Sequence, residues 1–293
     1  MCVESTVFSG CNNLSTIVVE QGNTVYDSRN NCNAIIETAK DRLVSGCKGT
    51  AIPDGIKTIG ANAFSYCWDL ASITIPSSVT TIENAAFYNT AIASIVIPNT
   101  VINIGGNPFA ACNSLSSFVV EEGNPIYYSS NNCLINKNNK MLVAGCSTST
   151  IPNDILIIGP SAFEGLHNIQ TITIPEGVWA IQSHAFSWCT LQTLRIPNSV
   201  ENVGQAAFSD LYEVKKIYLG SGVRRMDNDV FRGCPQHTDI YITATEVPIS
   251  NNSTFNGIGN ENPLTVHVPA EALDAYKASL SWSTMNLVGD ADR

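Results

Sequence analysis

One short motif recurs along most of the chain and limits what it can fold into. Ala-Phe, or a close variant, returns every 22 or 23 residues, apart from two longer gaps. The repeated phenylalanines are Phe8, Phe64, Phe87, Phe109, Phe163, Phe186, Phe208 and Phe231. A unit of this length cannot bury its apolar side chains alone, so neighbouring units must stack. The repeat therefore predicts an elongated repeat array over residues 1–293, in place of separate globular domains.

Each unit reads as a strand followed by a second apolar pair. Residues 95–97 alternate apolar with exposed positions, which indicates a strand with one buried face, and Pro98 ends it because proline cannot donate to a ladder. Val101 and Ile104 suit a short extended or 3₁₀ segment on the opposite wall. We predict a mostly β solenoid, in which each unit makes one turn of a flattened right-handed coil and its Phe rests on the next.

The chain has 10 cysteines but no CxxC pair, which argues against zinc-ribbon and thioredoxin sites. Half of them lie three residues after a repeat phenylalanine: Cys11, Cys67, Cys112, Cys189 and Cys234. Other turns have Thr90, Leu166 or Leu211 in that position. Because leucine can replace these cysteines, we interpret them as free thiols in the core. The alternative, a ladder of disulfides or metal ions, lacks partners in the leucine and threonine turns.

Two insertions, 18–50 and 119–149, break the rhythm and are copies of each other. Each predicts a β-hairpin, of residues 34–38 with 42–45 and of residues 134–136 with 141–144. Cys32 and Cys47 flank the first hairpin, and Cys133 and Cys146 flank the second. The sequence leaves open whether either pair is a disulfide or two free thiols.

A loose calcium loop is a weaker interpretation of the first insertion. Asp27, Asn30 and Asn31 supply oxygen ligands there, but Tyr128 takes the place of Asp27 in the second copy. Since tyrosine cannot replace a carboxylate ligand of calcium, we disfavour this site.

The region 240–293 departs from the repeat and is predicted to be a C-terminal cap. Residues 240–243 and 266–268 read as strands, and the polar segment 250–262 reads as a loop. Residues 270–278 predict the one short helix, with Leu273, Tyr276 and Leu280 at helical spacing. Such a cap would cover the last turn of the coil.

The repeat L-x-x-I-x-I-P-x-x-V-x-x-I-G-x-x-A-F-x-x-C resembles the BspA-type (Treponema pallidum-type) leucine-rich repeat, and residues 94–105 are a good instance. The segment from Val268 through Trp282 resembles the closing element of such arrays. This family is found on surfaces of host-associated bacteria such as Bacteroides. The resemblance implies a leucine-rich-repeat solenoid that acts in adhesion or host-protein binding, and it implies no enzyme.

Because Met1 starts inside a repeat, we expect the C-terminal part of a longer protein or a chain whose leader was removed.

Composition excludes several partners. The charged fraction is 14% and the net charge is −10, which argues against binding to nucleic acid or to an anionic membrane surface. No apolar run is long enough for a transmembrane helix. The N-terminus shows no signal peptide, which fits either a cytosolic chain or a surface or secreted chain whose leader was removed.

We find no motif for chemistry. The four histidines are not at metal spacing, and nucleotide-binding, zinc-protease and serine-hydrolase motifs are absent. We therefore assign no catalytic, cofactor or metal residue. A glycosidase that uses two scattered carboxylates is the disfavoured alternative, because a site needs local departures from the repeat.

Departures do occur at the outward positions of the later strands. These positions are small in the first turns, whereas the last turns carry Arg195, Lys216, Tyr218 and Tyr241. Tyrosine and arginine are favoured at binding hot spots, so these four residues form our candidate binding face; the alternative is drift on a solvated sheet. The residues Tyr66, Trp68, Tyr88 and Trp188 form a second set, which we expect to pack over the turns between coils.

The sequence thus favours a monomeric, noncatalytic surface or secreted module without cofactors, which recognises a host or matrix protein through its strands. A structural spacer and a glycan-binding module are the alternatives.

Overall fold

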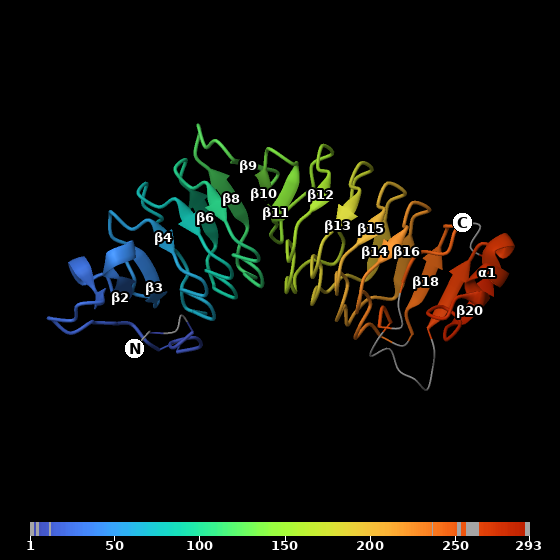
Figure 1. The fold of residues 1–293 in the computed structure, drawn as a ribbon, viewed down its shortest axis with the longest axis horizontal. Helices are drawn as coiled ribbons and strands as arrows, with labels where there is room; N and C mark the ends of the chain where they lie inside the picture. The colour runs from blue at the N-terminus through green and yellow to red at the C-terminus, as the bar shows by residue number, and fades with distance from the viewer. Residues whose placement is uncertain are drawn as a thin grey trace. The chain divides into compact units, whose positions relative to one another are not determined.

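A computed structural model describes residues 3, 6–11, 13–235, 237–250, 253–255 and 264–290. The chain forms two compact units: unit 1 comprises Met1–Asn138 and Val143–Ser149, and unit 2 comprises Asn139–Leu142 and Thr150–Arg293. Within each unit the turns stack side by side as a β-solenoid (Figure 1), which confirms the predicted fold class. The predicted single domain over 1–293 stays a prediction.

Unit 1 is built around a mixed sheet in the order β1-β2-β3-β4-β5-β7. Its first three strands are antiparallel, and β3, β4, β5 and β7 are parallel. The strands are β1 (Tyr26–Asp27), β2 (Ala34–Glu37), β3 (Arg42–Gly46), β4 (Thr58–Ile59), β5 (Thr81–Ile82) and β7 (Asn103–Ile104). The parallel pair β6 (Ser94–Ile97) and β8 (Ser117–Val120) and the antiparallel pair β9 (Tyr127–Ser130) and β10 (Cys133–Asn136) complete it, with the 3₁₀ turns η1 (Arg29–Asn31) and η2 (Thr38–Lys40).

Strands form in both insertions at the predicted positions. In the first, β2 pairs with β3 as a hairpin, with a register shift between Ile35 and Ile36. In the second, β10 and β11 (Met141–Ala144) occupy the predicted ranges. Each insertion also has an earlier strand, β1 or β9, which pairs with the next one and which the sequence did not indicate.

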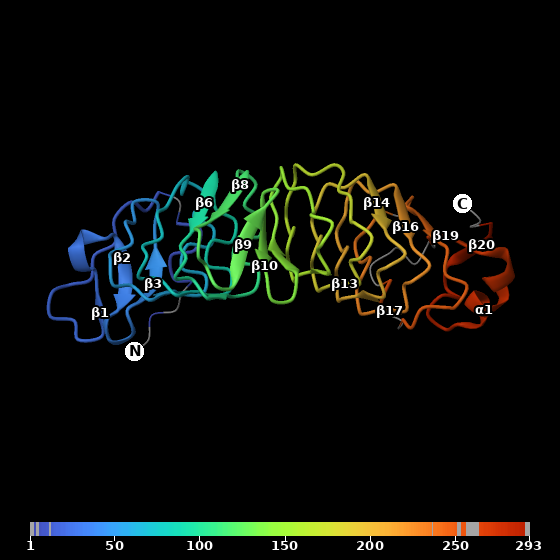
Figure 2. The same ribbon diagram turned by 90° about the horizontal axis from the view of Figure 1, so that it is seen from above.

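Unit 2 contains two parallel sheets, which lie along different sides of the coil (Figure 2). One runs from Met141 and Leu142 of β11 through β12 (Ile157–Ile158), β13 (Ala180–Ile181), β15 (Asn202–Val203) and β17 (Arg225–Met226). The other is β14 (Thr193–Ile196), β16 (Lys216–Leu219), β18 (Asp239–Ile242), β19 (Thr265–Val268) and β20 (Asn286–Gly289).

The second apolar pair of each repeat forms a two-residue parallel strand, as at Thr81–Ile82, so the extended alternative holds over the 3₁₀ one. The expected strands at 73–75 and 172–174 do not form. Both follow an insertion, and the chain before them, at 51–53 and 150–152, also has no strand. The chain there makes no ladder pairing, and the two sheets on this side begin one turn later, at β6 and β14.

The repeat phenylalanines stack within each unit. In unit 1 the centroids of Phe64 and Phe87 are 5.3 Å apart and those of Phe87 and Phe109 are 5.5 Å apart, with nearly parallel rings. In unit 2 a stacked series runs through Phe163, Phe186, Phe208, Phe231 and Phe255. Phe255 was not recognised as a member from the sequence. Phe8 is only partly buried and packs against a separate cluster that includes Ile17 and Val44.

The five cysteines that lie three residues after a repeat phenylalanine are free thiols. Most of them hydrogen-bond to the preceding turn. The Sγ–H of Cys112, Cys189 and Cys234 donates to the carbonyl oxygen of the previous repeat phenylalanine at 3.0, 3.0 and 3.3 Å. Burial raises the pKa of Cys189 and of Cys234 to about 12. Two members differ from the prediction of core thiols: Cys11 is exposed and Cys67 is half-buried. Cys11 belongs to the turn of Phe8, which lies outside the stacked series.

The C-terminal cap closes unit 2. The predicted helix 270–278 is the 3₁₀ turn η3 (Ala270–Ala272) followed by α1 (Leu273–Ala278), the one α-helix of the described residues. Tyr276 and Trp282 are fully buried; the Tyr276 hydroxyl donates to the carbonyl oxygen of Ala244 at 3.0 Å. Leu280, expected on the buried face, is 84% exposed because the helix ends at Ala278. Most of the expected loop 250–262 lies outside the described residues.

Candidate recognition surface

The predicted binding face lies on the sheet β14-β16-β18-β19-β20 of unit 2. Its strands are parallel and in register, so Arg195, Tyr218, Tyr241 and His267 are direct partners along one row. Inward-facing neighbours such as Leu194, Ile217 and Ile240 are buried, and this alternation turns the row toward solvent. The structure thus brings Arg195, Tyr218 and Tyr241 together and places Lys216 beside them.

The side chains of this row form a continuous stack. The guanidinium carbon of Arg195 lies 3.9 Å from the centroid of the Tyr218 ring. The rings of Tyr218 and Tyr241 have centroids 5.0 Å apart, and those of Tyr241 and His267 are 4.3 Å apart, with interplanar angles of 15° and 8°. Lys216 Nζ lies 5.9 Å from the Tyr241 centroid. We call these five residues the aromatic ladder.

His267 was missed by sequence reasoning. The alternation of Val266, His267 and Val268 places it at the outward position of its strand, but the spacing of the histidines does not single it out. In the structure its Nδ1 hydrogen-bonds to the Asp290 carboxylate at 2.6 Å. This bond fixes the imidazole against Tyr241 and ends the ladder.

The ring faces of the ladder are covered by one another, whereas the ring edges point outward. Tyr218 is flanked by Arg195 and Tyr241, and Tyr241 by Tyr218 and His267. Among the described residues, neither tyrosine hydroxyl makes a hydrogen bond, and neither Arg195 nor Lys216 has an ion pair. The ladder can therefore offer hydroxyls, cations and apolar ring edges to a partner, but few free ring faces.

The equivalent strands of unit 1 carry small side chains. β6 and β8 pair in register, and their outward residues are Ser94 with Ser117 and Val96 with Val119. Both valines are 48% exposed. This surface lacks hydrogen-bonding groups beyond the serine hydroxyls and carries no charge.

The second aromatic set makes the expected contacts between turns but stays exposed. Tyr66 meets Tyr88 edge to face at 5.3 Å, and Trp188 meets Tyr212, which the sequence did not single out, at 5.4 Å. Trp68 is 53% exposed. Tyr66 and Trp188 have φ values of 60° and 62°, at a position two residues after the repeat Phe. Other turns have Gly, Asn, Asp or Ala at this left-handed position, so both aromatic residues are conformationally strained.

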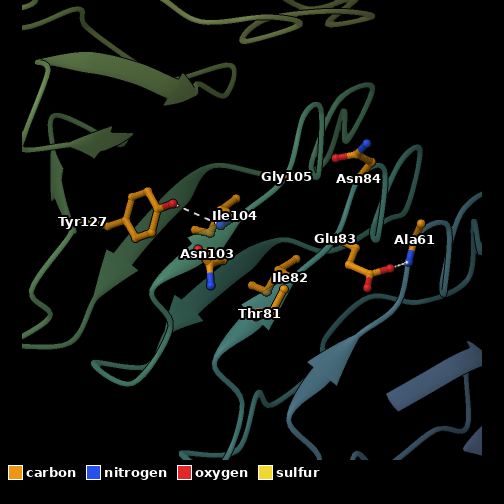
Figure 3. A pocket seen from close by; sticks show the side chains of 9 residues that line it. All are labelled: Ala61, Thr81, Ile82, Glu83, Asn84, Asn103, Ile104, Gly105 and Tyr127. Atoms are coloured by element: carbon orange, nitrogen blue, oxygen red, sulfur yellow. Dashed lines mark hydrogen bonds between the residues drawn. The ribbon is translucent and has the colours of Figure 1, made fainter. Parts of the chain in front are cut away.

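Each unit also contains a cavity beside its two-residue strands. The cavity of unit 1, drawn in Figure 3, has a volume of about 330 Å³ and is lined by Ala61, Thr81, Ile82, Glu83, Asn84, Asn103, Ile104, Gly105 and Tyr127. That of unit 2 is about 370 Å³ and is lined by Pro160, Trp179, Ala180, Ile181, Gln182, Ser183, Asn202, Val203, Gly204, Arg225 and Asp227.

Asp27, the carboxylate of the disfavoured calcium loop, is bonded to protein donors. The Asp27 carboxylate accepts hydrogen bonds from Arg29 at 2.8 and 2.9 Å and from Thr38 Oγ1 at 2.7 Å. The Arg29 guanidinium lowers the pKa of this carboxyl far below its usual range. The carboxylate is therefore already committed to protein donors. Across the described residues, no group of three or more His, Cys, Asp or Glu side chains is placed to hold a metal ion.

The flanking cysteines of both insertions carry free thiols in the structure. Cys47 Sγ donates to the carbonyl oxygen of Asn33, and Cys146 Sγ to that of Asn132, both at 3.5 Å. Burial raises the pKa of Cys133 to about 12. These equivalent contacts show that the two insertions share their internal packing as well as their sequence.

The profile of the BspA type leucine rich repeat region matches residues 45–144 and 144–260, in six copies. The chain belongs to the BspA-type leucine-rich repeat family. This confirms the resemblance seen in the sequence. No curated protein matches the chain.

Solved structures of two bacterial proteins have a similar fold. A leucine rich cell surface protein from Faecalibacterium prausnitzii A2-165 is 27% identical with a TM-score of 0.53; the match covers 81% of this chain and 58% of that one. The pneumococcal vaccine antigen PcpA is 22% identical with a TM-score of 0.59, covering 83% of this chain and 66% of PcpA. This chain thus spans less than two thirds of either protein.

The BspA-type family and fold are those of noncatalytic repeat proteins that commonly mediate protein interactions. Among the described residues, no helix has the length and apolarity to cross a bilayer.

Proposed function

We propose that the chain is a noncatalytic binding module at a cell surface or in secreted form, and that the aromatic ladder contacts a host or matrix protein. The observation that carries this proposal is the continuous stack from Arg195 through Tyr218 and Tyr241 to His267. The F. prausnitzii relative, described as a cell surface protein, supports the location.

The ladder has the properties of a protein-binding hot spot. Stacking holds the Arg195 guanidinium and both phenol rings in place before a partner arrives, so binding costs little side-chain entropy. Tyrosine and arginine combine a large contact area with hydrogen-bonding groups. A protein partner can use the ring edges and hydroxyls, which are the parts that the stack leaves open.

A glycan fits this particular surface less well, because a sugar usually covers the flat face of an aromatic ring. Here the ring faces of Tyr218 and Tyr241 are taken by their neighbours in the stack. A structural spacer would need no such ladder, and small side chains such as Val96 and Val119 would serve it equally well.

Binding to immobilised fibronectin, laminin and collagen tests the proposal. We expect the Tyr218→Ala/Tyr241→Ala variant to bind at least tenfold more weakly than the unaltered chain, while circular dichroism stays the same. The matched control is Val96→Ala/Val119→Ala, which trims the equivalent positions of unit 1 and should bind normally. Equal binding by all three proteins would reject the ladder, and no binding to any matrix protein would favour the spacer.

A further inference from the structure

The cavities of the two units are equivalent positions of the repeat. Eight lining residues of the first correspond to eight of the second at a constant offset of 99 residues, as Asn103 does to Asn202 and Gly105 to Gly204. The backbone agrees, because Ile102 N donates to Thr80 O just as Glu201 N donates to Trp179 O. Differences between the cavities therefore come from side chains.

Three polar side chains of the unit 1 cavity are used within the protein (Figure 3). The Glu83 carboxylate accepts from Arg42 Nη2 at 2.6 Å and from the Ala61 N–H at 2.8 Å. Asn84 Oδ1 accepts from the Gly106 N–H at 2.8 Å. The Tyr127 hydroxyl accepts from the Ile104 N–H at 3.0 Å, which satisfies the edge of β7. Glu83, the Asn84 carbonyl oxygen and Tyr127 are therefore committed to the protein, whereas the side chains of Thr81 and Asn103 make no hydrogen bond among the described residues.

The unit 2 cavity has open polar side chains at the two positions where unit 1 has Glu83 and Asn84. Gln182 stands in place of Glu83 and Ser183 in place of Asn84. Within the described part of the chain, the side chains of Gln182, Ser183 and Asn202 form no hydrogen bond. Two amides and a hydroxyl thus offer donors and acceptors around one space.

An exposed tryptophan stands at the rim of this second cavity. Trp179 is 44% exposed and occupies the place of Thr80 in unit 1. Arg225 Nε donates to Asp227 Oδ1 at 3.0 Å, so the two charges at the cavity compensate each other. A flat aromatic surface beside neutral hydrogen-bonding groups suits a ligand with one apolar face and many hydroxyls.

We propose that the unit 2 cavity binds a neutral pyranose ring of a glycan. The indole of Trp179 stacks on the C–H face of the sugar, and Gln182, Ser183 and Asn202 hydrogen-bond to its hydroxyls. The Arg225–Asp227 pair supplies a further donor and acceptor without favouring a charged ligand. This site lies on the sheet β11-β12-β13-β15-β17 and is separate from the aromatic ladder, so it goes beyond the proposed protein binding.

A glycan array with terminal mannose, galactose, N-acetylglucosamine, sialylated and sulfated structures tests this site, followed by saturation-transfer NMR with the matching monosaccharide. We expect the unaltered chain to retain neutral glycans. Trp179→Thr, which installs the unit 1 residue at an exposed position, should weaken binding at least tenfold, as should Gln182→Ala/Asn202→Ala.

Three control variants separate this site from other aromatic surfaces. Trp68→Ala removes an equally exposed indole elsewhere and should bind normally, and so should the ladder variant Tyr218→Ala/Tyr241→Ala. Thr80→Trp adds an indole beside the unit 1 cavity, where Glu83 and Asn84 Oδ1 are already hydrogen-bonded, and should gain no binding.

Retention of no neutral glycan at millimolar concentration would overturn the proposal, and so would unchanged binding by Trp179→Thr. Binding restricted to sialylated or sulfated glycans would also overturn it, because it would assign the site to an anion. If Thr80→Trp gained binding, the open polar groups would not be the deciding feature, and that part of the argument would fail.

Discussion

Units 1 and 2 build the same coil and differ in what they present. Both stack phenylalanines at intervals of 5 to 6 Å and pair two-residue strands in parallel. On their strand faces, unit 1 shows Val96 and Val119, whereas unit 2 shows Arg195, Tyr218 and Tyr241. The buried positions of the repeat thus specify the fold, while its outward positions are free to specify recognition.

The cavities repeat this contrast. In unit 1 the Tyr127 hydroxyl and the Arg42–Glu83 pair use the polar groups internally. In unit 2 Gln182 and Ser183, which replace Glu83 and Asn84, make no side-chain hydrogen bond among the described residues, and Trp179 stands beside them. At these two positions the side chains of unit 1 are bonded within the protein, whereas those of unit 2 are open to a ligand.

The largest expected effect tests whether the stacked phenylalanines stabilise the two units equally. Phe87→Ala in unit 1 and Phe186→Ala in unit 2 each remove a fully buried ring between two stacked rings. We expect each substitution to lower the free energy of unfolding by about 3–5 kcal/mol, as measured by urea denaturation. A cost much smaller in one unit would break the view that their cores are equivalent.

The next effect concerns binding, where the units should differ. If the ladder is the hot spot, single Tyr218→Ala and Tyr241→Ala substitutions should each weaken binding to the matrix partner by about 2 kcal/mol, as measured by surface plasmon resonance. Val96→Ala in unit 1 should change it by less than about 0.5 kcal/mol. A larger loss from the valine would move the recognition surface to unit 1.

The third prediction concerns the loss of stability at alkaline pH, when the buried cysteine thiols ionise. The pKa values of Cys189 and Cys234 are about 12 in the folded state against an ordinary 9.0, so their stabilising effect is complete below pH 9 and is lost as the pH rises toward 12. Above pH 9 we expect the free energy of unfolding to fall by up to about 1.4 kcal/mol per pH unit for each thiol.

The control for this pH effect is Cys189→Leu/Cys234→Leu, which copies the residue found at Leu166 and Leu211. Denaturation at pH 8 and pH 10 should show a smaller loss in this variant than in the unaltered chain. An identical loss would mean that these two thiols do not set the alkaline limit of unit 2.

The smallest expected effect is that of Tyr127→Phe, which removes the hydroxyl that accepts from the Ile104 N–H. We expect a loss of about 1 kcal/mol in the free energy of unfolding, from one hydrogen bond. Tyr218→Phe is the matched control, because its hydroxyl has no partner within the described residues and should cost nothing. A similar cost for both would remove the distinction between structural and available polar groups.

The fold was predictable because apolar residues that recur at constant spacing mark the buried positions of each repeat. The same reasoning missed Phe255, which lies 24 residues after Phe231 but lacks the preceding alanine and is set among polar residues. It also predicted strands at 73–75 and 172–174, where the apolar alternation is right but the backbone makes no ladder pairing. Strand formation depends on the adjacent turn, which a local pattern does not contain.

The site was predictable only in part. The outward alternation located Arg195, Lys216, Tyr218 and Tyr241, and the same alternation would have located His267. The covering of ring faces depends on side-chain conformation, which sequence spacing leaves undetermined. The cavity of unit 2 could not be predicted from the sequence either. Nothing in the sequence around Gln182 or Asn202 indicates that their side-chain amides lack a partner.

The contact between Phe255 and Trp282 determines where extra repeats could be inserted into this protein. Phe255 ends the ring series against Trp282, which meets it edge-on at 68° and 4.8 Å, and Trp282 is itself crossed by Tyr276 at 80°. A newly added phenylalanine would find no parallel ring to rest upon at this end. Extra turns are therefore best spliced in upstream of Phe231, between turns whose rings already lie flat.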